Sequence, residues 1–131
     1  MLVSVIFIDS IIDRTQTITQ DIVEEVIDGN TLLLSSGQYV RLIGINSDSE
    51  EAADFIRYHT VGKTVWLEKD DSTVDQFGRL RRYVWLRNPT DTNCEVQIAS
   101  YQLNALLIIN GYASPIYFGR NRQLFSQLLL E

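Results

Sequence analysis

The sequence predicts an α+β protein that is mainly β, a small closed or nearly closed barrel with helices packed on it. Short runs rich in Val, Ile, Tyr and Trp dominate the first part of the chain, with turn-forming residues between them. Helical spacing of apolar residues becomes prominent only later. A chain of 131 residues, 45% hydrophobic, suffices for one domain with a real core but not for two ordinary domains. We therefore expect a single domain over residues 1–131.

Six segments are expected to be strands, because β-branched and aromatic residues favour extended backbone. They are residues 3–8, 17–26, 31–34, 39–45, 64–69 and 82–86. The turns predicted at 28–30 and 35–38 contain glycine, which tolerates the positive φ of tight hairpins. Residues 20–45 should therefore form a three-stranded meander.

The N-terminal apolar segment, residues 2–8, is too short to span a membrane and has no basic flank typical of a signal peptide. We interpret residues 1–19 as an additional strand or as the remnant of a processed leader. We expect a soluble protein and assign it no compartment.

Three helices are expected. In the first, over residues 49–59, Ser49 is a suitable N-cap, Glu50 and Glu51 favour the first turn, and Gly62 ends the helix. The second covers residues 98–110 and has a broad apolar face. The third is short, over residues 123–130.

The charge balance argues against a protein that gathers nucleic acid over its whole surface. Lysine and arginine total 11 against 17 acidic residues, which gives a net charge of −6. Arginines nevertheless concentrate in the second half of the chain, at positions 79, 81, 82, 120 and 122. Two interpretations stay open: a local basic strip that binds phosphate, or solvated surface arginines.

Common catalytic and metal patterns are missing from the sequence. Cys94 is the single cysteine, so neither an internal disulfide nor a cysteine-rich zinc site is expected. His59 is the single histidine and lies in a predicted helix, with no recognisable nucleophile motif.

Five segments, by contrast, occur in the order and spacing of a known family. They are Val-Ile-Asp-Gly-Asn-Thr at 26–31, Val-Arg-Leu-Ile-Gly-Ile at 40–45, Asp-Gln-Phe-Gly-Arg at 75–79, Tyr-Val-Trp at 83–85, and the segment at 103–113. Together they resemble the thermonuclease (staphylococcal nuclease-like) family over about residues 20–122. The resemblance implies a five-stranded OB-fold barrel with about three helices, and calcium-dependent hydrolysis of DNA and RNA phosphodiesters.

The resemblance also places the family's metal ligands and general base. Its two metal-binding aspartates correspond to Asn30 and Asn46, and its glutamate that orients or activates water corresponds to Ser49. An amide adds no negative charge to offset calcium dehydration, and an unaided serine hydroxyl is a poor base near neutral pH. We therefore expect no functional metal site and an impaired mechanism. Substitute ligands remain an alternative, with Asp28, Asp48 and Glu50 as the nearby carboxylates.

Two arginines match the family's pair that grips the reacting phosphate. They are Arg41 and Arg79, whose planar forks of donors suit phosphate oxygens. In the alternative interpretation, each pairs with a local acid such as Asp28, Asp70 or Asp75.

Two aromatic residues match positions beside the nucleotide in the family. Tyr117 and Phe77 are candidates for stacking on a base, at about 1–3 kcal/mol per good stack. Packing at the rim of the barrel is the other interpretation for both.

We therefore predict a staphylococcal nuclease-like domain without calcium-dependent activity that acts as a nucleic-acid-binding or protein-binding module, and the acidic balance favours a protein partner. The alternative is an active metal-dependent endonuclease on DNA or RNA that uses rearranged carboxylates. Calcium is expected as a cofactor only in that alternative.

Overall fold

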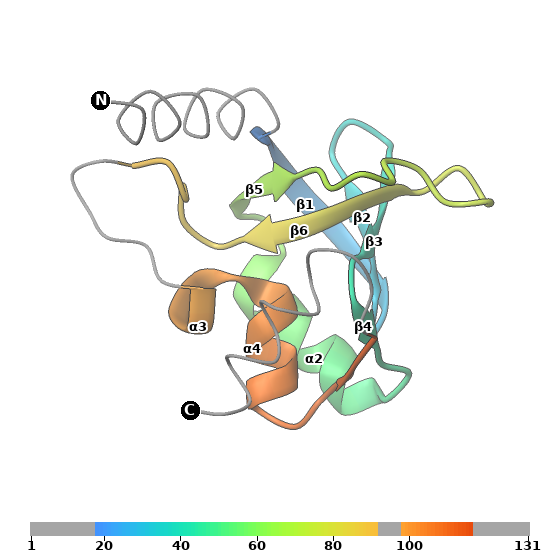
Figure 1. Cartoon of the computed structure of the whole chain (residues 1–131), viewed down its shortest axis with the longest axis vertical. Helices are drawn as coiled ribbons and strands as arrows, with labels where there is room; N and C mark the ends of the chain where they lie inside the picture. Colours follow the sequence, from blue (N-terminus) through green and yellow to red (C-terminus); the bar gives the residue numbers. More distant parts are fainter. Residues whose placement is uncertain (1–17, 92–97, 117–131) are drawn as a thin grey trace, which may run out of the picture.

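The computed structural model describes residues 18–91 and 98–116, in which five strands close into a barrel (Figure 1). The barrel strands are β1 (Ile18–Asp28), β2 (Thr31–Leu34), β3 (Tyr39–Leu42), β5 (Thr64–Glu68) and β6 (Leu80–Trp85). Their order around the barrel is β1-β2-β3-β6-β5, and every neighbouring pair is antiparallel except β3 and β6, which are parallel. This topology is consistent with an OB-fold and confirms the predicted class.

The strand predicted over 39–45 is wrong as one continuous strand. It divides into β3 and the short β4 (Ile45–Asn46), which leaves the barrel and pairs with β7 (Ser114–Pro115). Gly44 lies between them with φ of 75°. That left-handed backbone breaks the extended run and redirects the chain, a conformation that glycine adopts at little cost.

The first predicted helix is confirmed as α2 (Glu50–Thr60). The Ser49 hydroxyl accepts a hydrogen bond from the Ala52 N–H at 3.1 Å, so Ser49 is the N-cap. Val61 is the C-cap, and Gly62 follows with φ of 79°.

The second predicted helix is wrong as one continuous helix. It divides into α3 (Ile98–Tyr101) and α4 (Leu103–Ile109), because Gln102 has an extended backbone with φ of −86° and ψ of 115°. Gln102 instead forms an isolated bridge with Trp85 at the end of β6. The predicted strand over 3–8 and the predicted helix over 123–130 lie outside the described residues.

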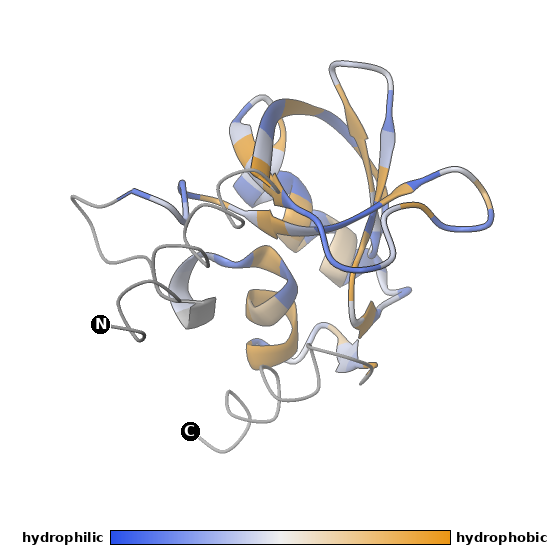
Figure 2. Ribbon diagram, turned by 45° about the horizontal axis from the view of Figure 1, so that its top comes forward, coloured by the Kyte–Doolittle hydropathy of each residue, from blue (hydrophilic) through white to orange (hydrophobic). Residues whose placement is uncertain are grey.

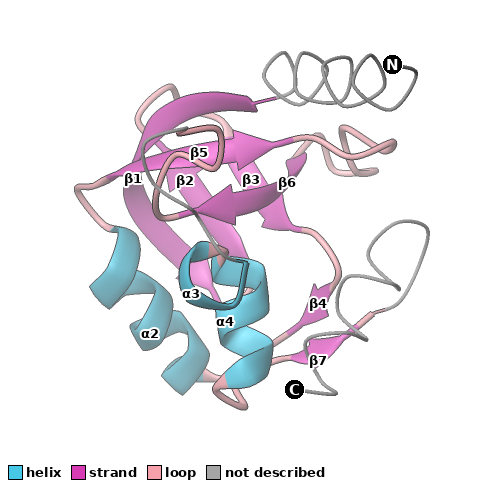
Figure 3. Cartoon of the chain, turned by 60° about the vertical axis from the view of Figure 1, so that its left-hand side comes forward, coloured by secondary structure: helices cyan, strands magenta, loops and turns pink. Residues whose placement is uncertain are grey.

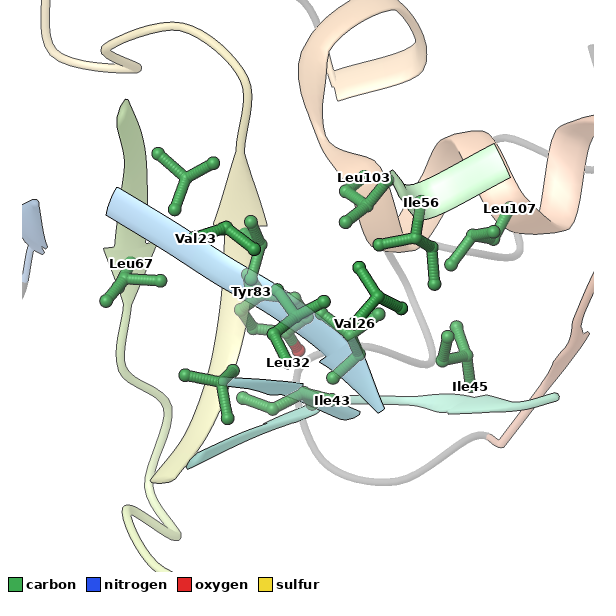
Figure 4. Close-up of a cluster of buried hydrophobic side chains, with 14 of the residues drawn as sticks. Val23, Val26, Leu32, Ile43, Ile45, Ile56, Leu67, Tyr83, Leu103 and Leu107 are labelled. Atoms are coloured by element: carbon green, nitrogen blue, oxygen red, sulfur yellow. The ribbon is translucent and has the colours of Figure 1, made fainter. Parts of the chain in front are cut away.

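The helices gather at one end of the barrel (Figure 3), where α2 contacts β1 and α4 contacts β6. Inward-pointing strand residues and the apolar faces of α2 and α4 form one continuous core, labelled in Figure 4 from Val23 and Leu32 to Ile56 and Leu107. Figure 2 shows the alternation of polar and apolar residues along the strands and the hydrophobic character of α4. The helices therefore close that end of the barrel.

One polar side chain lies fully buried in this core. The Asn104 Oδ1 accepts the Val84 N–H at 2.9 Å, and its Nδ2 donates to the carbonyl oxygens of Ile43 at 2.8 Å and Arg82 at 3.3 Å. Asn104 therefore ties α4 to β6 and to the end of β3. Within the ranges 18–91 and 98–116, no helix has the length and apolar character needed to cross a membrane.

Candidate functional site

A groove with a volume of about 400 Å³ lies beside β3, β6 and the loop that joins β5 to β6. This loop projects from the barrel (Figure 1). The residues that line the groove include Arg41, Arg79, Arg81, Asp75 and Phe77. We call this feature the arginine groove, after its three arginines. It brings the two sequence-predicted arginines together.

The strand register explains why these arginines meet. Arg41 on β3 and Arg81 on β6 are paired across the parallel ladder, and Arg41 also pairs with Thr31 on β2. Arg79 precedes β6 by one residue, and its Nη1 donates to the Thr31 hydroxyl at 3.0 Å. Strands β3 and β6 and the turn just before β6 therefore bring three arginines to one groove.

The turn before β6 is organised by Asp75. Its Oδ1 accepts the N–H groups of Phe77 and Arg79, both at 2.9 Å, and its Oδ2 accepts from the Arg79 Nε at 2.6 Å. Gly78 has φ of 82°, which completes the turn. The interpretation that Arg79 pairs with a local acid is therefore observed in the structure. Because that ion pair uses Nε, and Nη1 contacts Thr31, the fork is held in a fixed direction.

These contacts shift the pKa of Asp75. Burial alone would raise it, but the hydrogen bonds from the Arg79 backbone and guanidinium and from the Phe77 N–H outweigh burial and hold the pKa below its ordinary value. A carboxyl group whose pKa is lowered in the folded state stabilises the fold at pH values above its ordinary pKa. This contribution is lost as the pH falls through the folded-state pKa. The ion pair with Arg79 is therefore present at neutral pH.

Arg41 is held by backbone carbonyls. Its Nη1 donates to the Leu42 oxygen at 2.5 Å and its Nη2 donates to the Ile45 oxygen at 2.9 Å. These two bonds fix the plane of the guanidinium and still leave donors for a ligand, because the group has five N–H bonds.

The groove carries mutually repelling positive charges. Burial lowers the pKa of the Arg41 guanidinium, and the charges of Arg79 and Arg81 lower it further. The carboxylates of Asp28 and Asp75 act in the opposite direction. Guanidinium groups stay protonated in proteins, so an anion bound in the groove would relieve this repulsion.

Both ends of the Asn30 amide contact the protein. Its Nδ2 donates to the Ser47 carbonyl at 3.0 Å, and its Oδ1 accepts from the Thr31 hydroxyl at 2.8 Å. The Asp28 Oδ1 accepts the Asn30 N–H at 2.9 Å and so closes the turn between β1 and β2. An amide N–H therefore points at the Ser47 carbonyl.

The remaining sequence-predicted positions are dispersed. Ser49 caps α2, Glu50 pairs with Arg57 at 2.8 Å on the surface of that helix, and Asn46 and Asp48 are exposed. Across the described part of the chain, no three His, Cys, Asp or Glu side chains gather as a set suited to a metal ion.

Phe77 lies at the rim of the arginine groove with 73% of its surface exposed, and the Arg79 Cζ is 5.4 Å from the centre of its ring. Core packing therefore does not account for this aromatic. Tyr117, the second candidate for stacking, lies outside the described residues.

Comparison with known proteins gives two curated relatives, and no protein-family model matches. A thermonuclease of Staphylococcus hyicus is 33% identical over 76 residues, covering 47% of this chain and 45% of the relative. A thermonuclease of Staphylococcus intermedius is 31% identical over 80 residues, covering 50% and 48% respectively. About half of the chain is therefore similar in sequence to thermonucleases. The chain spans about half the length of these curated relatives.

The contacts of Asn30 do not fit the calcium that this thermonuclease-like relationship implies. A hard cation needs oxygen ligands, several of them charged, whereas here an amide nitrogen faces the Ser47 carbonyl. Turning the amide around would bring two oxygens together without a proton between them, so the observed orientation is the favourable one.

The sequence did not predict Arg81 as a residue of the functional site. The segment at 79–82 contains three arginines, and only Arg79 belongs to a recognisable motif. The signal that identifies Arg81 is its pairing with Arg41 across the parallel ladder, a long-range contact between β3 and β6.

Proposed function

We propose that this nuclease-like domain binds the phosphate groups of single-stranded nucleic acid in the arginine groove and does not hydrolyse them with calcium. The observation that carries the proposal is the convergence of Arg41, Arg79 and Arg81 on one groove. Planar guanidinium groups bind phosphate oxygens through paired hydrogen bonds, and these charge-assisted bonds are stronger than neutral ones.

The arrangement favours a ligand that combines phosphate with an aromatic base. Arg41 and Arg79 are already oriented by protein contacts, so little side-chain entropy is lost when they bind an anion. Phe77 lies exposed at the rim of the same groove, where a base can stack on it. A single strand presents both groups without the cost of separating a duplex.

The absence of calcium-dependent hydrolysis is supported by how the nearby polar side chains are used. Asn30 bonds to Ser47, Ser49 caps α2, and Glu50 pairs with Arg57. No carboxylate among these is placed to act with the arginines as a base or as a set of charged metal ligands. Binding without turnover is therefore the function that this geometry favours.

A second candidate is an active nuclease, and similarity to two thermonucleases favours it. It requires Asp28 or Asp48 to provide ligands in place of the amides. Asp28 already closes the turn at Asn30, which leaves less of its carboxylate for a metal. A protein partner is the third alternative, in keeping with the net charge of −6.

Replacing Arg41 with glutamine tests the binding proposal. We expect a labelled single-stranded oligonucleotide to bind the wild-type domain saturably at low salt in a chelator, with an affinity that falls as salt rises. The Arg41→Gln variant should bind roughly tenfold to a hundredfold more weakly, because charged hydrogen bonds to phosphate are lost. Fluorescence anisotropy measures both.

The matched control is Arg57→Gln, which removes the same charge from the exposed surface of α2. It should change the affinity less than twofold, because salt screens the interaction between the ligand and a surface charge far from the groove. Equal losses in both variants, or no saturable binding by the wild type, would contradict the proposal.

A further inference from the structure

We propose that Arg81 makes the arginine groove selective for a terminal phosphate monoester of a nucleic-acid strand over an internal phosphodiester. This inference rests on the proposed function and names the ligand group that the groove prefers. The inference concerns Arg81, a third arginine in the groove beside the pair of Arg41 and Arg79.

The position of Arg81 places it beside the phosphate-binding pair. Arg81 lies opposite Arg41 in the ladder between β3 and β6 and lines the same groove as Arg79. Its backbone N–H donates to the Thr73 carbonyl at 2.9 Å, which also anchors the loop between β5 and β6 to the strand. The backbone of Arg81 is therefore held both by the strand ladder and by the loop.

The charge of the groove exceeds what an internal phosphate neutralises. The lining residues contribute three positive charges from arginine and one negative charge from Asp75, a difference of two. An internal phosphodiester carries one negative charge, whereas a phosphate monoester carries about −1.5 to −2 at neutral pH. The monoester is therefore the better electrostatic match.

The number of acceptors leads to the same ligand. A phosphodiester offers two non-bridging oxygens, and a terminal phosphate offers three strong acceptors. Three guanidinium groups from three different positions suit three acceptor oxygens. Phe77 at the rim leaves room for the adjoining nucleotide to stack as the strand leaves the groove.

The test compares three labelled oligonucleotides of one sequence in a chelator: one with a 5′-phosphate, one with a 3′-phosphate and one with neither. We expect at least one phosphorylated strand to bind about tenfold more tightly than the unphosphorylated strand. Arg81→Gln should reduce that preference to less than about twofold, while Arg87→Gln, which removes an exposed arginine outside the groove, should retain it.

Lowering the pH from 7.5 to 5 provides a test that needs no variant. A phosphate monoester has its second pKa at about 6, so at pH 5 it is mostly a monoanion, and the preference for the phosphorylated strand should become weaker. The charged side chains that line the groove are Arg41, Arg79, Arg81 and Asp75, and the Asp28 carboxylate, which is not part of the lining, acts on Arg41. Any titration of these protein groups also alters binding of the unphosphorylated strand, which serves as the internal control.

Equal binding of phosphorylated and unphosphorylated strands by the wild type would overturn the inference while leaving the proposed function intact. A preference of undiminished size in Arg81→Gln, or at pH 5, would also overturn it. Failure of all three strands to bind would overturn the proposed function together with this inference.

Discussion

Replacing Asn104 with leucine is expected to destabilise the domain by about 3–5 kcal/mol, because several buried backbone groups lose their partner at once. The Val84 N–H and the Ile43 carbonyl are both bonded to this side chain, and Asn104 is fully buried. Leucine has a similar volume, so the loss arises mainly from unsatisfied polar groups. Urea unfolding followed by tryptophan fluorescence measures the change in the free energy of unfolding.

Asn110→Ala is the matched control, since Asn110 is an exposed asparagine at the end of the same helix, bonded only locally to the Leu106 carbonyl. It should cost less than about 1 kcal/mol. If Asn104→Leu also lowered the free energy of unfolding by less than about 1 kcal/mol, the bonds between α4 and β6 would not contribute as described.

Replacing Asn30 with aspartate is expected to lower the stability by about 1–3 kcal/mol at neutral pH in a chelator. The substitution keeps the acceptor for the Thr31 hydroxyl but removes the donor to the Ser47 carbonyl. It also places a carboxylate against that carbonyl. This result would show that the amide itself, and not only the shape of the side chain, is part of the folded structure.

The pH dependence provides a second signature. A carboxylate facing a carbonyl has a raised pKa in the folded state, so the destabilisation should be greatest above that pKa. It should shrink as the pH falls towards the ordinary carboxyl range, because a protonated carboxyl donates to Ser47. Thermal unfolding at several pH values measures this trend.

Asn88→Asp provides the control for Asn30→Asp. The Asn88 Oδ1 accepts from the backbone N–H and the hydroxyl of Thr90, and aspartate preserves both bonds. Its stability should change by less than about 0.5 kcal/mol. Equal effects at Asn30 and Asn88 would refute the special role of the amide that faces Ser47.

The sequence was sufficient for features that depend on nearby residues. Runs of β-branched and aromatic residues predicted the barrel strands, and the capping pattern at Ser49 predicted the start of α2, since both signals act over a few positions. The acids near the arginines in the sequence, Asp75 among them, similarly raised the ion pair with Arg79 as an alternative.

Features that depend on distant contacts were not predicted. The break at Gln102 follows from its bridge to Trp85, and the exit of β4 from the barrel follows from its pairing with β7. The place of Arg81 in the groove likewise depends on the parallel pairing of β3 with β6. Local propensity carries no information on which strands meet.

The most direct test of our account incubates single-stranded DNA with the purified chain at high concentration in calcium, beside chelator and Arg79→Ala controls. Arg79 lines the arginine groove and is held there by Asp75 and Thr31. Cleavage by this protein should therefore depend on Arg79, whereas cleavage by a contaminant should not. We predict no calcium-dependent cleavage, although the same DNA binds to the wild-type domain. Cleavage in calcium that disappears in both controls would contradict the account and assign catalysis to rearranged carboxylates.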